Sequence, residues 1–327
     1  MFVREKVIKA ILDSGENFMS GEQLSKKLGI SRTAVWKHIN ALREEGYNIE
    51  SVNKKGYRLA EKPDDILSSE NIAYNLPTEF IGKKVIHLDT VGSTNDYAKE
   101  IGNKVSGGTL IISEQQTKGK GRLGRVWKSK SGDGIWMSLI IKPKIEPYKA
   151  PFLTLVAGAS VVKALSNLGV EASIKWPNDI IVHNKKICGI LTELSAEMER
   201  VNYVVIGIGI NIKTIDFPDE IKEKATSLYK EGYKLSRVDI VRQFCIEFEK
   251  LYKGYILDGN KQDTLELCRK YSAIIGKQVY VIKNNKRELV KCIDINENGN
   301  LIVKEKNGEI QEIMSGEVSI RGVKGYV

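Results

Sequence analysis

The first 60 residues place their apolar side chains at helical spacing. A first helix is predicted by apolar residues three and four positions apart: Val3, Val7, Ile8, Ile11 and Leu12. A second, shorter helix covers residues 21–28. Ser20 and Gln23 form a capping-box pattern at its start, and Gly29 suits the left-handed residue that follows a helix end. Two short amphipathic helices therefore open the chain.

A third helix follows at once, over residues 32–46. Ser31 is its predicted N-cap, and Val35, Ile39 and Leu42 form its inner face at spacings of four and three. Two helices joined by a turn of about three residues that contains glycine form a helix-turn-helix. The pattern thus predicts that motif for residues 21–46.

Residues 47–60 alternate apolar and polar positions on either side of an Asn-Lys-Lys-Gly turn, which predicts a hairpin. A hairpin directly after a recognition helix is a wing, so we predict a winged helix-turn-helix DNA-binding domain over residues 1–62. The polar residues at the start of the third helix and at the wing tip suit base edges and phosphates. The candidate DNA-binding residues are Ser31, Arg32, Thr33, Lys37, Lys54 and Lys55. The alternative is a winged domain used only for packing or protein contacts.

The pattern changes after the polar, proline-containing stretch "EKPDDILSSENI". Apolar strand runs and helical segments then mix, without the regular strand–helix alternation of a Rossmann domain. The expected strands are residues 84–89, 108–116, 134–143 and 201–212, and the expected helices are residues 93–102 and 237–255. We predict a central α/β domain over residues 63–270.

The most apolar run, "APFLTLVAGASVVKALSNLG" over residues 150–169, approaches the length of a membrane span. It contains Pro151, Lys163 and Asn167 and is rich in small residues. We therefore predict a buried helix packed on a sheet, and no membrane association.

Short alternating strands divided by turns fill residues 271–327. The predicted turns lie at Asn284-Asn285, at residues 297–299 and at Asn307-Gly308. Such a series is typical of a small β-barrel, here of the SH3-like kind. The fold class is thus α+β, with a winged helix-turn-helix, a central mixed α/β domain and a C-terminal barrel.

Composition and charge add two constraints. The net charge of +10 favours anionic partners such as nucleic acid, nucleotides or phosphates. The four cysteines are far apart without a Cys-x-x-Cys pair, and no apolar signal segment opens the chain. We expect reduced thiols and a cytoplasmic protein. The three histidines lie in unrelated contexts, so no metal site is expected.

Common catalytic motifs are missing from the sequence: it has no P-loop, GxSxG elbow, HExxH motif or strand–GxGxxG–helix fingerprint. The stretch "TKGKGRLGRVW", residues 117–127, instead combines three glycines with four cationic side chains. Glycines let a backbone approach a ligand, and arginine pairs with phosphate or carboxylate. Taken alone, the stretch fits a solvated basic turn equally well.

Three further segments carry candidate chemistry. Ser93 and Thr94 precede a helix, where they either cap it or bind a small polar group. Lys175 lies in an apolar strand before "WPND", where it either snorkels to solvent or binds an anion. Gly207 and Gly209 remove the side chains from one face of a strand, which lets a ligand approach. Without a nucleophile, histidine base or metal cluster, the set fits an adenylation catalysed by positioning and electrostatic stabilisation.

The motifs "GSTNDYA", "EQQTKGKGRLGRVW", "KWPNDI", "KKICGILTE" and "GIGIN", in this order and spacing, resemble the biotin protein ligases. With the helix-turn-helix and the "GEVSIRG" tail, the whole chain resembles the bifunctional type, a biotin–[acetyl-CoA-carboxylase] ligase and biotin operon repressor. The resemblance implies that biotin and Mg-ATP form biotinyl-5′-AMP, which then acylates a lysine of a biotin carboxyl carrier protein. It also implies repression of biotin synthesis genes by operator binding and a ligand-promoted homodimer, with Mg²⁺ arriving with ATP.

The resemblance assigns roles by motif position. Ser93, Thr94 and Asn95 would contact the biotin head group or line its pocket, and Gln116 would lie at its reacting end. Lys120, Gly121 and Arg122 belong to the loop that closes over biotin and the adenylate. The remaining roles fall to Lys175, as a bridge between carboxylate and α-phosphate, to Gly207 and Gly209 as the floor, to Asn211 at the adenylate, and to Arg321 toward ATP or the acceptor.

Arg122 and Lys175 are the predicted catalytic residues, and both, with Asn211 and Arg321, are the predicted ATP contacts. One departure from the family is the loop sequence "GKGR", where the family commonly has GRGR; Lys120 keeps the charge and loses the planar fork. Two alternatives stay open, a biotin-sensing transcription factor without catalysis and a lipoate-type ligase.

Overall fold

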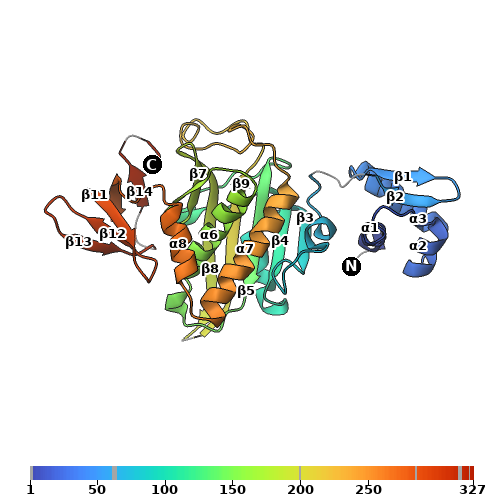
Figure 1. Ribbon diagram of the computed structural model, residues 1–327, viewed down its shortest axis with the longest axis horizontal. Helices are drawn as coiled ribbons and strands as arrows, with labels where there is room; N and C mark the ends of the chain where they lie inside the picture. Colours follow the sequence, from blue (N-terminus) through green and yellow to red (C-terminus); the bar gives the residue numbers. More distant parts are fainter. Residues whose placement is uncertain (1–2, 61–64, 199, 284–285, 316–318, 324) are drawn as a thin grey trace.

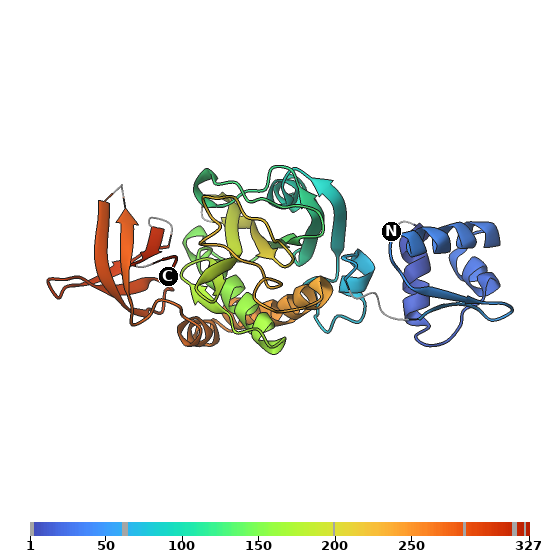
Figure 2. The same cartoon turned by 90° about the horizontal axis from the view of Figure 1, so that it is seen from above.

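The computed structural model describes residues 3–60, 65–198, 200–283, 286–315, 319–323 and 325–327. Three units follow one another along the long axis, with the largest in the middle (Figures 1 and 2). The first unit consists of α1 (Val3–Asp13), α2 (Gly21–Leu28), α3 (Arg32–Glu44), β1 (Ile49–Val52) and β2 (Gly56–Leu59). This arrangement confirms the predicted winged helix-turn-helix.

Local sequence signals fix the ends of these helices. The Gln23 amide donates to Ser20 Oγ at 3.1 Å while the Ser20 amide donates to Gln23 Oε1 at 2.7 Å, so the predicted capping box forms. Gly29 has a φ of 66°, the left-handed value expected after a helix end. The α3 helix ends at Glu44, two residues before the predicted Gly46, which has a φ of 95°.

The central unit is built on a seven-stranded sheet of order β3-β4-β5-β9-β8-β7-β6. Its strands are β3 (Val85–Val91), β4 (Thr109–Gln116), β5 (Gly134–Ile141), β6 (Ser173–Lys175), β7 (Asp179–Val182), β8 (Lys185–Glu197) and β9 (Arg200–Asn211). The pair β3 and β4 is parallel, and the other neighbouring pairs are antiparallel. The mixed sheet confirms the predicted α+β class.

Helices cover both faces of this sheet. Helices α6 (Phe152–Asn167), α7 (Arg237–Leu257) and α8 (Gln262–Lys270) lie on one face (Figure 1), and their apolar side chains form the large core. Helix α5 (Thr94–Ile101) packs on the other face, where Ala98 joins Ile111, Ile140 and Tyr203 in a smaller core. Successive strand residues point to opposite faces, which explains why neighbouring residues enter different cores.

The apolar segment Pro147–Asn167 is long and apolar enough to cross a membrane by length and composition. Helix α6 within it buries most of its side chains against the sheet and α7, so the predicted buried helix is confirmed. The short elements around the large helices are α4 (Ser69–Ala73), η1 (Gly102–Lys104), η2 (Arg122–Gly124) and η3 (Pro147–Lys149).

The third unit is an antiparallel sheet of order β13-β12-β11-β10-β14. Its strands are β10 (Gln278–Lys283), β11 (Lys286–Ile295), β12 (Leu301–Lys304), β13 (Ile310–Ile313) and β14 (Ser319–Gly322). The predicted turns at residues 297–299 and Asn307-Gly308 separate β11 from β12 and β12 from β13. The Asn284-Asn285 turn and the 62/63 domain boundary lie outside the described residues.

Candidate functional site

Nine of the twelve predicted small-molecule contacts line one narrow cavity of about 50 Å³ above the glycine-containing part of the sheet. The predicted residues that line it are Ser93, Thr94, Asn95, Gln116, Lys120, Gly121, Arg122, Gly207 and Gly209. They come from the start of α5, the end of β4, β9 and the cationic loop, which is residues 117–127. Segments more than 100 residues apart in sequence therefore converge on one site.

A hydrogen-bond network holds the start of α5. The Thr94 amide and hydroxyl both donate to Gln116 Oε1, at 2.8 and 3.1 Å. Ser138 Oγ is 2.8 Å from Thr94 Oγ1 and donates to Asn95 Oδ1 at 2.6 Å. Ser93 occupies the N-cap position, but its hydroxyl makes no capping bond, so it is free to bind a polar group in the cavity.

The floor of the cavity requires glycine. Gly189 of β8 and Gly209 of β9 are register partners, and Gly207 lies two residues away. An added Cβ would lie 2.2 Å from Asn95 Oδ1 at position 207 and 2.6 Å from Trp127 Nε1 at position 209. The prediction of a strand face without side chains is correct, and Gly189 extends it to the next strand.

Trp127 is a cavity residue to which sequence reasoning assigned no role. Its indole lies on Gly189 and Gly209, where added Cβ atoms would approach it to 2.9 and 2.6 Å. Among the described residues, its Nε1 is one of four buried side-chain nitrogen or oxygen atoms without a hydrogen-bond partner. Buried N–H groups usually find an acceptor, so an unpaired one that lines a cavity is suited to binding a ligand. The sequence signal that could have identified Trp127 is an aromatic residue at the end of the glycine-rich loop.

Polar contacts of Lys120 and Arg122 hold the cationic loop against its neighbours. Lys120 Nζ lies 2.6 Å from Asp96 Oδ2 on α5. Arg122 donates to Asn178 Oδ1 at 2.7 Å and to the Ser315 carbonyl at 2.8 Å, so it connects the loop to the central and the C-terminal unit. Burial lowers the pKa of Arg122, as expected for a cation enclosed without a carboxylate in direct contact. At the tip, Leu123 and Val126 are more than 70% exposed.

Lys186 is a second cavity lysine, in addition to Lys120, and sequence reasoning did not single it out. It lines the cavity, and its Nζ lies 2.5 Å from Asp179 Oδ1 and 5.2 Å from the centre of the Trp127 ring. Its position on β8, three residues before Gly189, puts a positive charge beside the open strand face.

Lys175, predicted to reach the reacting groups, does not line this cavity. It ends the edge strand β6, opposite Asp179, and is 2% exposed. Its Nζ donates to the Tyr326 carbonyl at 2.6 Å and lies 3.4 Å from the centre of the Tyr326 ring. Burial lowers the pKa of Lys175 to about 7. Its role at the reacting groups stays a prediction.

Asn211 and Arg321 also lie outside the residues that line the cavity. The buried Asn211 donates to the Thr226 carbonyl at 3.1 Å and so holds the long segment between β9 and α7. Arg321 lies on β14 opposite Tyr280. The roles of these two residues as ATP contacts stay predictions.

The predicted DNA-binding residues are all exposed on the winged unit. Arg32, Thr33 and Lys37 are exposed on α3, while Lys54 and Lys55 are exposed at the tip of the β1–β2 hairpin. Ser31 Oγ accepts a hydrogen bond from the Ala34 amide at 3.1 Å, so it caps α3. Trp36, 53% exposed on the same helix, is an aromatic neighbour that sequence reasoning did not mention.

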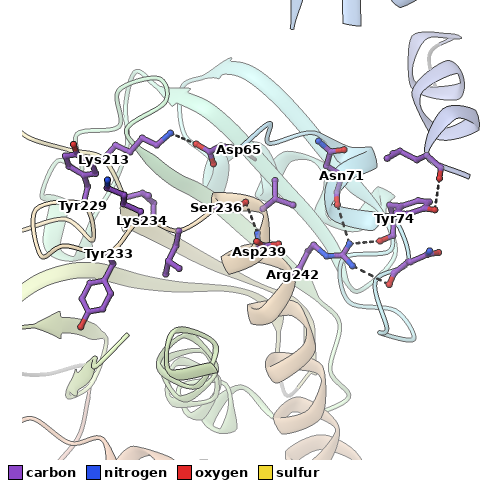
Figure 3. A pocket seen from close by; sticks show the side chains of 15 residues that line it. Asp65, Asn71, Tyr74, Lys213, Tyr229, Tyr233, Lys234, Ser236, Asp239 and Arg242 are labelled. Carbon is purple, nitrogen blue, oxygen red and sulfur yellow. Dashed lines mark hydrogen bonds and ion pairs between the residues drawn. The ribbon is translucent and has the colours of Figure 1, made fainter. Parts of the chain in front are cut away.

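A larger cavity of about 650 Å³ is lined mainly by residues of the central unit around α4 and the start of α7 (Figure 3), together with Leu12 of the winged unit. Arg242 of α7 donates to the carbonyls of Ile72 and Tyr74 at the end of α4, at 2.8 and 2.5 Å. The Tyr74 hydroxyl donates to the Leu12 carbonyl at the end of α1, at 2.8 Å.

Within the described ranges, no group of three or more His, Cys, Asp or Glu residues is placed to hold a metal ion.

Three family models match consecutive parts of the chain. Residues 3–58 match an HTH domain, residues 88–211 match the Biotin/lipoate A/B protein ligase family, and residues 274–321 match the Biotin protein ligase C terminal domain. Each of the three matches falls within one of the three structural units.

Curated relatives cover almost the whole chain. The bifunctional ligase/repressor BirA of Bacillus subtilis is 42% identical over 97% of this chain and 98% of its own length. The bifunctional ligase/repressor BirA of Escherichia coli is 32% identical over 96% of both chains. A solved biotin protein ligase from Aquifex aeolicus, in complex with biotin and ATP, matches with a TM-score of 0.65 and 32% identity. That match covers 73% of this chain and 99% of the Aquifex chain.

Proposed function

The chain belongs to the bifunctional biotin protein ligase and repressor family, and we propose that it activates biotin with ATP, transfers it to a carrier protein and represses transcription. The first reaction joins a biotin carboxylate oxygen to the α-phosphorus of ATP and releases pyrophosphate. In the second, an acceptor lysine amine attacks the biotinyl carbonyl and AMP leaves. The acceptor is a lysine of the biotin carboxyl carrier protein of acetyl-CoA carboxylase.

The observation that carries this proposal is the narrow cavity with its glycine floor and cationic walls. Gly189, Gly207 and Gly209 let the Trp127 ring and the Asn95 amide lie directly on the sheet, and the Ser93 hydroxyl and the unpaired Trp127 Nε1 offer hydrogen bonds to a ligand. A volume of about 50 Å³ is far below the 300 Å³ or more of typical ligand pockets, so the loop has to open for entry. Reclosing it shields the reactive adenylate from water.

Cations are proposed to stabilise the charge that develops during adenylation. We assign the role of bridging the carboxylate and the α-phosphate to Lys175, the register partner of Asp179. Arg122 supplies a planar fork suited to phosphate, and Lys120 a second loop charge. Asn211, at the end of β9, and Arg321, on β14, are proposed to contact the adenylate and ATP.

The remaining assignments complete the reaction scheme. Mg²⁺ accompanies ATP and is held by its phosphates, without a dedicated protein site. The protein acts in the cytoplasm, which suits its free and buried thiols.

Repression requires the winged unit. Arg32, Thr33 and Lys37 on α3 face the operator, and Lys54 and Lys55 on the wing contact phosphates. Bound biotinyl-5′-AMP promotes a homodimer, because ordering the loops in advance lowers the cost of forming an interface. The targets are biotin synthesis genes.

The test is mass spectrometry of the purified protein after incubation with biotin and Mg-ATP, together with biotin-dependent ATP–pyrophosphate exchange. We expect a retained biotinyl-5′-AMP and transfer to an isolated carrier domain. A protein that binds biotin without exchange would support a sensor without catalysis, and exchange driven by lipoate in place of biotin would support a lipoate ligase.

The role of Lys175 is tested with a matched pair of variants. Lys175→Met should lower the exchange rate by about 10²–10³-fold, the loss typical of removing one group that stabilises transition-state charge. Lys185→Met removes a lysine of β8 that does not line the cavity, and should keep the parent rate. Equal rates for the two variants would remove Lys175 from the mechanism.

A further inference from the structure

The exposed tryptophan of α3 lies outside the core of the winged unit. Trp36 is 53% exposed, whereas Val35, Ile39 and Leu42 of the same helix are buried. Trp36 belongs neither to the core of this unit nor to the partly buried apolar residues packed against it. Large aromatic side chains are enriched where proteins meet their partners, so an exposed one outside the core indicates a contact surface.

The surface around this tryptophan is basic. Arg32 and Thr33, four and three residues before Trp36, are its neighbours on the helix, and Lys37 follows it; all are exposed. Residues 31–43 contain three lysine or arginine side chains and no aspartate or glutamate. An apolar ring framed by positive charge suits a partner that is anionic and also presents apolar groups.

The wing is fixed to the helices before any partner binds. Met19, just before α2, exchanges two backbone hydrogen bonds of 2.9 Å with Tyr57 of β2. Gly56 makes this approach possible, because an added Cβ would lie 2.2 Å from the Met19 carbonyl oxygen. Arg43 of α3 donates to the Ile49 carbonyl of β1 at 2.9 and 2.8 Å. Helix and wing therefore form one preorganised surface, which lowers the entropic cost of binding.

The major groove of DNA matches the chemistry of this surface. Phosphates line its rims, and the 5-methyl group of thymine is an apolar group among the base edges inside it. Recognition helices enter the groove with their N-terminal residues, and Trp36 is the fifth residue of α3. Lys37 and the wing lysines are cations that suit the phosphates, so the apolar ring is left to meet a base edge.

We propose that Trp36 is a specificity-determining residue of the winged unit: its ring packs on the 5-methyl group of a thymine in the major groove and so sets part of the operator sequence. The inference rests on the proposed repressor function. It does not involve the ligase reaction, because the narrow cavity is built from residues of the central unit.

The experiment starts from the parent protein incubated with biotin and Mg-ATP, which selects its binding sites from a pool of random DNA duplexes. Dissociation constants are then measured for the selected duplex and for forms in which one thymine at a time is replaced by deoxyuridine, which removes only the methyl group. We expect one such replacement in each half-site to weaken binding by the parent about fourfold, the loss for one buried methyl group.

A double-mutant cycle assigns that methyl group to Trp36. Trp36→Ala should weaken binding to the selected duplex about tenfold or more, and the same deoxyuridine replacement should then have no further effect. Tyr148→Ala is the matched control, because Tyr148 is also an exposed aromatic residue, 76% exposed in the central unit. It should keep the affinity of the parent for the duplex.

Salt dependence separates base reading from phosphate contact. Trp36→Ala removes no charge and should keep the slope of log Kd against log salt concentration. Lys55→Ala, at the wing tip, should lower the magnitude of that slope by about one. All three variants should keep the parent rate of biotin-dependent exchange, which also shows that the catalytic part is intact.

Fluorescence provides a test that does not need the alanine variant to fold. Trp136 and Trp176 are 1% exposed, so acrylamide has little access to them, and Trp36 is the tryptophan of the winged unit. The selected duplex should reduce acrylamide quenching of the parent, and this reduction should be absent from Trp36→Phe.

The outcomes separate the two claims. A parent that carries biotinyl-5′-AMP but selects no duplex would overturn the proposed repressor function and the inference with it. Three results would overturn the inference alone: a parent indifferent to every deoxyuridine replacement, a deoxyuridine effect that persists in Trp36→Ala, or a duplex that leaves acrylamide quenching of the parent unchanged.

Discussion

The winged unit keeps a core of its own, whereas the C-terminal sheet shares the apolar core of the central unit. At the first junction, Tyr74 donates to Leu12 and Tyr47 pairs with Ser68 at 2.9 Å, while Ile66 and Tyr74 pack against the winged core. At the second junction, residues of β10 to β14 belong to the same core as α6 and α7.

This difference shows which of the three units are held together as one rigid body. Polar groups at an opened junction regain hydrogen bonds to water, so their separation costs little, while an exposed apolar core costs roughly 25 cal/mol per Å². The C-terminal sheet is therefore an integral part of the catalytic body, and its Tyr326 and Ser315 contact Lys175 and Arg122. The winged unit is attached in a way that lets it reorient.

Truncation should reveal the largest difference between the two junctions. A chain of residues 65–327 should fold and keep biotin-dependent exchange, because the large core stays complete. A chain of residues 1–270 should lose exchange and aggregate, because it exposes apolar surface of the central unit. Circular dichroism, light scattering and the exchange assay would measure this, and an active 1–270 chain would contradict the shared core.

A single methyl group should disturb the C-terminal junction nearly as clearly. Gly299 has a φ of 82°, and an added Cβ would lie 2.4 Å from Leu155 Cδ1 of α6. Gly299→Ala should lower the free energy of unfolding by about 3 kcal/mol through backbone strain and overpacking. Gly308 has a φ of 94° with nothing near an added Cβ, so Gly308→Ala should cost only about 1 kcal/mol. Equal losses in urea denaturation would show that the 299 contact with α6 adds nothing.

The buried Lys175 predicts a pH dependence at the same junction. Its pKa is about 7 in the folded protein and near 10.4 in the unfolded chain, so between these values the unfolded chain binds more protons. Stability should therefore rise with pH from about 7 to about 10, by at most about 1.4 kcal/mol per pH unit from this group. Lys175→Met should flatten that rise. The measurement is urea unfolding from pH 6 to 10, and an unchanged slope in the variant would contradict a neutralised lysine.

The smallest effect is expected at the polar junction. Arg242→Met removes the donors to the end of α4 and should cost about 1–2 kcal/mol locally. Trypsin should then cut between residues 60 and 84 faster than in the parent, while exchange stays unchanged. Lys250→Met, an exposed change on the same helix, is the control. Slower exchange in Arg242→Met would mean that the winged junction also supports catalysis.

Local signals made much of the fold predictable. The capping box at Ser20, the Gly29 helix end and the turn at Asn307-Gly308 depend on residues close in sequence, and all three form as predicted. The glycine floor was equally accessible, since side-chain direction alternates along β9.

The lysines show where sequence reasoning stops. Lys175 and Lys186 both lie among apolar strand residues beside a conspicuous motif, and their different surroundings depend on the strand order. The strand β6 is the outer strand of the sheet and is covered by Tyr326, whereas β8 lies next to β9 and beside the cavity. Contacts between residues some 150 positions apart, such as Lys175 with Tyr326, leave no local pattern in the sequence.

The four cysteines report selectively on one part of the molecule. Cys188, Cys245, Cys268 and Cys292 are free and buried in the large core, and the winged unit contains none. Burial raises the pKa of Cys245 and of Cys268 to about 12, so thiolate is scarce while the core is closed. A thiol-reactive dye should therefore label the protein when the core of the catalytic body opens, and should not respond to motions of the DNA-binding end. The native chain thus reports which of the two parts has unfolded.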